Sequence, residues 1–217
     1  MIDFVAGTLA EAADALLIGV GAGRSWDESG RWLATRMGGW LDGYLDAADF
    51  TGKEGELVSI PGAGLVPHGT VVLVGLGSAP DAEVLRKAAG SAGRALTRAE
   101  SVATTLGSRL AGGEAAVALG FLLGQYSFQK HRSQPKPVKT TSLRLVGAEP
   151  EGLEAAERAR VVAGAVAKAR DLVNEPSVNK PPEYLAGVAR EVGERTGVRV
   201  KVYDKDELTA GGFGGIL

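Results

Sequence analysis

Short runs of apolar residues predict four β-strands in the first 150 residues. These runs span residues 16–20, 56–60, 70–75 and 141–146. The run at 70–75 (TVVLVG) is rich in valine and continuously apolar, which is typical of a strand buried on both faces of a sheet. A fifth strand is predicted at 198–203, where Val198, Val200 and Val202 alternate with charged or aromatic residues.

Apolar residues that recur every three or four positions predict helices between and after these strands. The predicted helices cover residues 32–46, 114–128, 151–173, 182–196 and 204–210. One further helix, of roughly 25 residues, is predicted to follow residues 70–75 and to reach Leu106, because its apolar stripe continues that far. Ser78, Pro80 and Asp81 predict its start, since a serine cap, an early proline and an early acid all favour a helix N-terminus.

Strands that alternate with helices favour an α/β layered domain. After Pro150 the pattern changes to a long alanine-rich helix followed by further elements. We therefore expect an α/β domain at 1–148, an interdomain linker helix at 149–174 and the start of another domain at 175–217. The apolar, glycine-rich end at 211–217 is unusual for a terminus, so the chain is expected to be part of a longer protein.

Composition narrows the class of protein further. The 217 residues are 45% apolar and 23% charged, as in ordinary globular chains, and no cysteine is available for disulfides, thiolate zinc sites or nucleophilic catalysis. The formal net charge of −2 makes the whole chain a poor electrostatic match for a polyanion. The longest apolar runs are too short to span a membrane, and no signal peptide is apparent, so a cytoplasmic protein is expected.

The strongest candidate for a ligand site is a glycine-rich turn. Gly75, Gly77 and Ser78 follow a predicted strand and precede a predicted helix, where backbone N–H groups can hold a phosphate. However, Pro80 replaces the third glycine of a dinucleotide-binding motif, and the chain has no Walker sequence. A tight turn that needs the conformational freedom of glycine is therefore the favoured interpretation, and the three residues remain weak candidates.

Other chemically capable residues are expected to be structural. His68 and His131 have no partner at metal-ligand spacing, so both are predicted to be solvated loop residues. Clustered acids are expected to lie on a wet surface, and the tryptophans to pack in a core or interface. These residues are Asp42, Asp46, Asp49, Asp204, Asp206, Trp26, Trp32 and Trp40.

One segment is densely basic. Residues 129–139 (QKHRSQPKPVK) are polar and twice interrupted by proline, which predicts a surface loop. Its positive residues can steer an acidic partner or nucleic acid, but few aromatic side chains are near for base stacking. A solvated loop is favoured, and nucleic acid is not an expected partner. The basic cluster consists of Lys130, His131, Arg132, Lys136 and Lys139.

Several segments, taken in chain order, resemble the N-terminal part of the leucyl aminopeptidases, peptidase family M17. Residues 72–77 with 86–90 resemble the family's central strand and helix, and residues 119–128 (LGFLLGQYSF) resemble a helix motif of the family. Residues 169–186 are similar to the junction after its interdomain helix. Residues 202–215 resemble the next strand and glycine turn, with Phe213 where methionine is usual.

The resemblance implies a macro-like N-terminal α/β domain, a linking helix and the first elements of a catalytic domain. It also implies a parent enzyme that removes N-terminal residues from peptides, preferring leucine, and that forms homo-hexamers. In the family two divalent metals, manganese or zinc, activate a water and polarise the scissile carbonyl. Their ligands and the assisting Lys and Arg are expected beyond Leu217, so no catalytic or metal-binding residue is assigned within this chain.

Two functions are therefore considered. The first is the N-terminal portion of a metal-dependent leucyl aminopeptidase, inactive as a 217-residue chain because it lacks the metal and catalytic residues. The alternative is a stand-alone macro-like module that binds ADP-ribose or another nucleotide at Gly75 to Ser78, or DNA at the basic segment. The interrupted glycine motif and the acidic balance of the chain favour the first.

Overall fold

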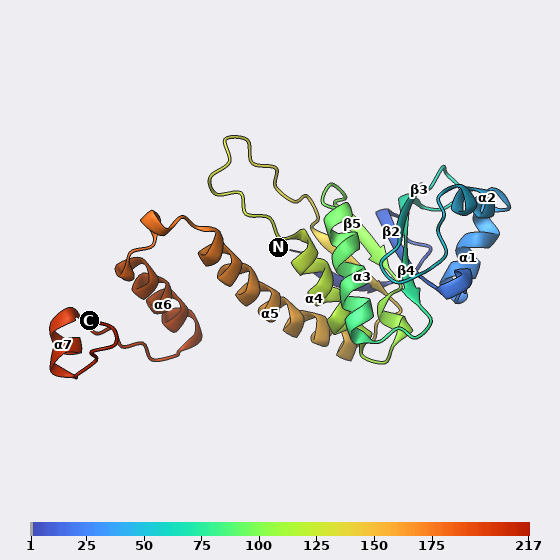
Figure 1. Ribbon diagram of the computed structural model, residues 1–217. Helices are drawn as coiled ribbons and strands as arrows, with labels where there is room; N and C mark the ends of the chain where they lie inside the picture. The colour runs from blue at the N-terminus through green and yellow to red at the C-terminus, as the bar shows by residue number, and fades with distance from the viewer. Residues whose placement is uncertain (1) are drawn as a thin grey trace. The chain divides into compact units, whose positions relative to one another are not determined.

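A computed structural model describes residues 2–217 of the chain. It divides into two compact units, residues 1–169 and 170–217, with the division inside one long helix. The first unit contains all the strands and is described first (Figure 1). No helix among residues 2–217 combines the length and apolar character needed to cross a bilayer.

The first unit is built on a six-stranded sheet in the order β1-β6-β5-β2-β4-β3. All neighbouring strands are parallel except β3, which pairs antiparallel with β4 at one edge. Because parallel strands need crossover connections, helices are expected on both faces of this sheet. The strands are β1 (Asp3–Gly7), β2 (Ala13–Gly21), β3 (Leu57–Pro61), β4 (His68–Gly77), β5 (Ser101–Thr104) and β6 (Ser142–Val146).

Alternate residues of the central strands enter two separate cores. On β4, Val72 and Val74 belong to one core, whereas Val71 and Leu73 belong to the other. All four side chains are completely buried. Burial on both faces explains why this strand is a continuous apolar run in the sequence.

Helices cover both faces of the sheet (Figure 1). One face packs against α1 (Glu28–Met37) and α2 (Trp40–Ala47) through Leu33, Met37, Leu41 and Leu45. The other packs against α3 (Ala82–Ala95), α4 (Gly113–Gln125) and the first half of α5 (Pro150–Asn174), and its largest fully buried side chain is Phe121. Short 3₁₀ turns occur at Ala22–Arg24 and Gly107–Arg109. The first unit is therefore a three-layer α/β/α domain.

Helices α3 and α4 meet backbone to backbone. A Cβ atom on Gly120 would lie 2.0 Å from the carbonyl oxygen of Arg86, and one on Gly124 would lie 2.1 Å from that of Gly90. These two contacts advance along both helices in the same direction, so α3 and α4 run parallel and their C-termini reach the same edge of the sheet. Only glycine permits this approach.

The second unit consists of helices with little buried surface. It contains a 3₁₀ turn at Ser177–Asn179, α6 (Pro182–Thr196) and α7 (Lys205–Ala210). Gly197 ends α6 in the left-handed conformation, and Asp204 forms a capping box with Glu207 at the start of α7. The predicted strand at 198–203 is wrong for the described chain, because this segment pairs with no other strand.

The main error of the sequence interpretation concerns the predicted helix of roughly 25 residues. Helix α3 instead ends at Ala95 with Leu96 as its C-cap, and the chain then enters β5. Its N-cap is Asp81, whose carboxylate accepts the Val84 N–H, rather than Ser78. The apolar stripe persisted beyond Leu96 because the buried side of β5 follows directly in the sequence.

Two further differences are local. The predicted helix at 32–46 is divided into α1 and α2 at Gly38, whose φ of 65° a helix does not accommodate. Strand β1 was not anticipated. The remaining predicted strands of the first unit correspond to β2, β3, β4 and β6, and the other predicted helices to α4, α5, α6 and α7.

His68 also differs from expectation. It is the first residue of β4 and is only 2% exposed, so the predicted solvated loop position is wrong. Its Nε2 donates to the Leu9 carbonyl at 3.2 Å, its Nδ1 is buried without a partner, and the Trp32 ring lies 6.4 Å away. Burial lowers the pKa of His68 from its ordinary value of 6.5, and the hydrogen bond to Leu9 only partly opposes this.

The helix contact gives a first prediction. Gly124→Ala places a methyl group against the Gly90 carbonyl, so α3 and α4 must separate, and we expect a loss of about 1–3 kcal/mol in the free energy of unfolding. Urea unfolding monitored by circular dichroism measures this change. Gly164→Ala in α5 is the matched control, because nothing lies within 4 Å of its added methyl group. The control should raise stability by up to about 1 kcal/mol, and equal effects of the two variants would contradict the proposed contact.

His68 gives a second prediction, on pH dependence. Because its folded-state pKa is lowered, the unfolded chain binds the proton more readily, so stability is retained above pH 6.5 and lost as the pH falls below it. As the pH falls from 6.5 toward the lowered pKa of His68, the free energy of unfolding should decrease in the wild type. It should decrease less steeply in His68→Gln. His131→Gln is the control, since His131 is exposed. Identical pH profiles for wild type and His68→Gln would refute the prediction.

Candidate functional site

The carboxyl edge of the parallel strands is the first place to look for a site. Strand β2 lies between β4 and β5, and the chain passes from β4 to β5 across it. Ligands of open α/β sheets bind at such a change of direction, outside the carboxyl ends of the strands. The glycine turn predicted from the sequence lies at this edge, at the end of β4.

The backbone donors of this turn are already used. Gly75 N–H donates to the Glu56 carbonyl at 2.8 Å, and Gly77 N–H donates to the Gly52 carbonyl at 3.0 Å. A Cβ atom on Gly75 would lie 1.9 Å from the Lys53 carbonyl oxygen, so glycine is needed for the approach of this loop. The N–H groups of Gly75 and Gly77 are therefore not free to hold a phosphate, and Ser78 is exposed beside them.

The loop that covers the turn is organised by one carboxylate. Glu56 accepts hydrogen bonds from Thr51 N–H at 2.7 Å, from the Thr51 hydroxyl at 2.9 Å and from Lys53 N–H at 3.2 Å. Burial raises the pKa of Glu56, but these hydrogen bonds outweigh it, so the pKa lies below its ordinary value. Glu56 is thus a structural anion at this edge.

A half-buried ion pair closes the neighbouring part of the same edge. Arg109 contacts the Asp27 carboxylate at 2.8 Å and donates to the Gly19 carbonyl in β2. Asp27 also accepts the Ser29 hydroxyl at 2.7 Å, and Ser29 lies 3.0 Å from the Thr105 hydroxyl. Burial lowers the pKa of Arg109, and Asp27 partly opposes the shift.

This network joins the start of α1 to the ends of β2 and β5. Every charge in it is paired, and no nucleophile lies beside a free general base, so the arrangement is structural rather than catalytic. The sequence interpretation missed Asp27 and Arg109 because they are far apart in the chain and belong to no motif.

The described residues do not fit a metal centre. Among residues 2–217, no three His, Asp or Glu side chains converge closely enough to hold a metal ion. Asp42, Asp46 and Asp49 are exposed, as expected, and Asp46 pairs with Arg24 at 2.6 Å. Asp204 is used as the α7 cap, and Asp206 is exposed.

The tryptophans serve packing. Trp26 and Trp32 are partly buried against the core on the α1 and α2 side of the sheet. Trp40 is 40% exposed and meets Tyr44 edge to face, with ring centroids 5.7 Å apart. Trp26 and Trp32 therefore pack against a core, as predicted, whereas Trp40 lies on the surface of this unit.

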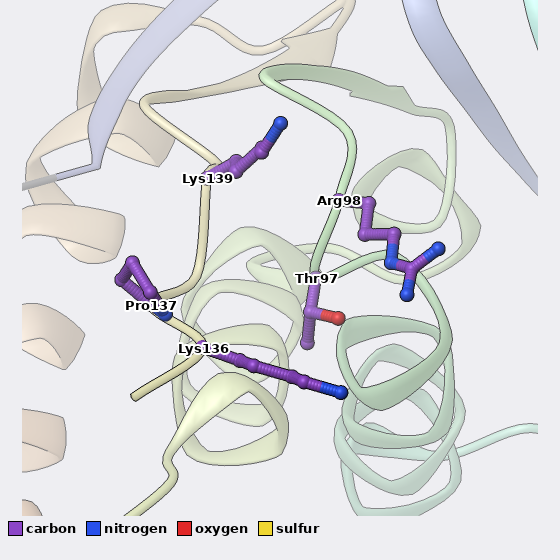
Figure 2. A pocket seen from close by; sticks show the side chains of 5 residues that line it. All are labelled: Thr97, Arg98, Lys136, Pro137 and Lys139. Carbon is purple, nitrogen blue, oxygen red and sulfur yellow. The ribbon is translucent and has the colours of Figure 1, made fainter. Parts of the chain in front are cut away.

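The basic segment has an irregular backbone and is mostly exposed, as predicted. Lys136 and Lys139 line a pocket of about 480 Å³ together with Thr97, Arg98 and Pro137 (Figure 2). The sequence interpretation missed Thr97 and Arg98 because it placed them inside a helix.

Comparisons with known proteins identify the family. The N-terminal domain of the cytosol aminopeptidase family matches residues 17–135. A probable cytosol aminopeptidase of Streptomyces griseus is 37% identical over 98% of this chain and 46% of its own length. A protein with the same description from Nocardia farcinica is 39% identical over 97% of this chain and 44% of its own length.

Solved structures agree on the fold. A tomato leucine aminopeptidase variant superimposes with a TM-score of 0.86 at 24% identity, covering 97% of this chain and 46% of its own. The bottromycin maturation enzyme BotP gives a TM-score of 0.72 at 27% identity, covering 92% of this chain and 41% of its own. This chain therefore spans slightly less than half the length of the relatives it matches.

The match to the family domain covers more than half of the chain, and the similarity to the curated relatives continues through the second unit. The mixed α/β fold expected from the sequence is also found. The chain belongs to the cytosol aminopeptidase family, peptidase family M17, and contains its N-terminal domain.

Proposed function

We propose that this chain is the N-terminal part of a metal-dependent leucyl aminopeptidase that releases N-terminal residues, leucine preferred, from peptides. The observation that carries the proposal is the similarity to probable cytosol aminopeptidases along 98% of the chain, which includes both units. The naming of these relatives also supports a cytosolic location.

In the proposed enzyme, the metal ions and their ligands belong to the remaining part of the relatives' length. The described residues provide no group of three metal-ligating side chains, so no catalytic step is assigned to them. When bound, the two divalent ions supply an activated water and polarise the scissile carbonyl. The 217-residue chain is accordingly proposed to be inactive.

The α/β unit is proposed to act on assembly and on access to the active site. Its carboxyl edge is occupied by Glu56, Asp27 and Arg109, all committed to structural contacts. These contacts favour a rigid supporting domain over a catalytic one. The parent enzyme is proposed to form homo-hexamers through its catalytic domain.

The inactivity of the chain is directly testable. The purified 217-residue protein should not hydrolyse leucine p-nitroanilide with Mn²⁺ or Zn²⁺, because the expected metal ligands lie beyond Leu217. Its thermal unfolding midpoint should be the same with Mn²⁺, with Zn²⁺ and with EDTA. Hydrolysis that requires metal and follows the purified chain through chromatography would disprove the proposed inactivity.

The parent activity needs a different experiment. The source gene is sequenced past the Leu217 codon, and the complete reading frame is expressed. We expect metal-dependent hydrolysis of leucine p-nitroanilide, faster than that of the glutamate analogue, and its loss after EDTA treatment. A complete frame that is inert toward aminoacyl anilides with both metals would contradict the proposed enzyme.

A further inference from the structure

A basic pocket lies at the amino edge of the sheet, opposite the edge described above. Thr97 and Arg98 form one wall, just after α3 and before β5. Lys136, Pro137 and Lys139 form the other wall, between α4 and β6. The pocket thus joins two crossover connections that follow neighbouring helices (Figures 1 and 2).

The cations of this pocket lack counter-charges. Among the described residues, the side chains of Arg98, Lys136 and Lys139 form no ion pair and no hydrogen bond. Other arginines of the same unit do pair with carboxylates. These are Arg24, Arg86, Arg109, Arg144, Arg158 and Arg160, whereas Arg31, Arg36 and Arg94 hydrogen-bond to backbone carbonyls or a serine instead. The pocket therefore gathers cationic side chains that the chain itself leaves unneutralised.

The walls of the pocket are held by hydrogen bonds. Lys139 N–H donates to the Thr97 carbonyl at 2.9 Å, which joins the two walls directly. The buried Thr140 hydroxyl donates to the Ala99 carbonyl at 2.8 Å and accepts from the Gln125 side chain at 2.7 Å. Lys136 N–H donates to the Gln129 side chain at 3.1 Å. These bonds fix the backbone from which the cations extend.

Gathering unpaired cations on one pocket costs electrostatic energy, which solvent lowers here because all three side chains are exposed. The negative ends of the α3 and α4 dipoles reduce this cost but provide no full counter-charge. An anion in the pocket would provide it.

The available donors match a phosphoryl group. The guanidinium of Arg98 offers a planar pair of N–H donors, the Lys136 ammonium offers a point charge and Thr97 offers a hydroxyl, whereas the Lys139 side chain extends away from these groups (Figure 2). In Figure 2, Arg98 and Lys136 extend to the same side of Thr97 as its hydroxyl. We propose that this pocket binds the phosphoryl group of a small molecule or free phosphate.

The observations favour a small ligand over a nucleic acid. A volume of about 480 Å³ is within the range of small-molecule sites. No aromatic side chain lines the pocket on which a base can stack, and the whole chain has a net charge of −2. The proposal is independent of the aminopeptidase function, because it concerns binding by this chain alone.

The test is a calorimetric titration of the 217-residue protein at low ionic strength with orthophosphate, tripolyphosphate and glucose 6-phosphate. Lys136→Gln and Arg98→Gln should each weaken binding about fivefold, as expected for loss of one exposed charge pair. Arg132→Gln is the matched control, because Arg132 is an exposed cation of the same segment that does not line the pocket. The control should change affinity less than twofold.

The ligands distinguish the source of the phosphoryl group. Tighter binding of glucose 6-phosphate than of orthophosphate would support a phosphorylated small molecule, and the reverse would support the free ion. Absence of heat with all three ligands at 10 mM would overturn the proposal. So would equal weakening by Arg132→Gln and Lys136→Gln, or binding of a single-stranded oligonucleotide through Arg98 and Lys136 without binding of any small phosphate.

Discussion

The contact between the backbones of α3 and α4 sets the geometry of the rest of the first unit. Because Gly120 and Gly124 of α4 touch the Arg86 and Gly90 carbonyls of α3, the two helices lie parallel at minimal separation. Their C-termini then reach the same edge of the sheet, so the connections that follow them become neighbours. The Lys139 to Thr97 hydrogen bond and the basic pocket are consequences of that approach.

The two edges of the sheet differ in whether their cationic side chains are paired. At the carboxyl edge, where α/β proteins commonly bind ligands, Arg109 is paired with Asp27, and Glu56 accepts the loop's donors. The chain's own groups thus occupy the positions where a ligand's charges would act. At the amino edge, Arg98, Lys136 and Lys139 have no such partners. Unpaired cations that could bind an anionic ligand therefore lie at the amino edge. The strand topology alone would have pointed to the carboxyl edge.

Much of this fold was predictable from the sequence, because helix caps are local features and burial on both faces of a sheet leaves a continuous apolar run. The valine-rich run of β4 reflects burial on both faces, and Asp204 and Gly197 mark helix ends through their own caps. Strand β5 was not predictable because its buried residues continue the spacing of α3, and periodicity does not record where a chain reverses. The same error hid Arg98 and Thr97. The pairing of Asp27 with Arg109 and the burial of His68 near Trp32 depend on tertiary contacts that no short motif encodes.

In the second unit, the segment at 198–203 shows the same difference between local features and those that depend on tertiary contacts. Helices satisfy their own backbone groups, so the caps of α6 and α7 define them although little of the unit is buried. A strand takes its hydrogen bonds from a neighbour, and an alternating valine pattern forms none without one. Val198 and Val202 accordingly remain exposed. The alternation therefore records a preference for pairing that the described residues leave unsatisfied.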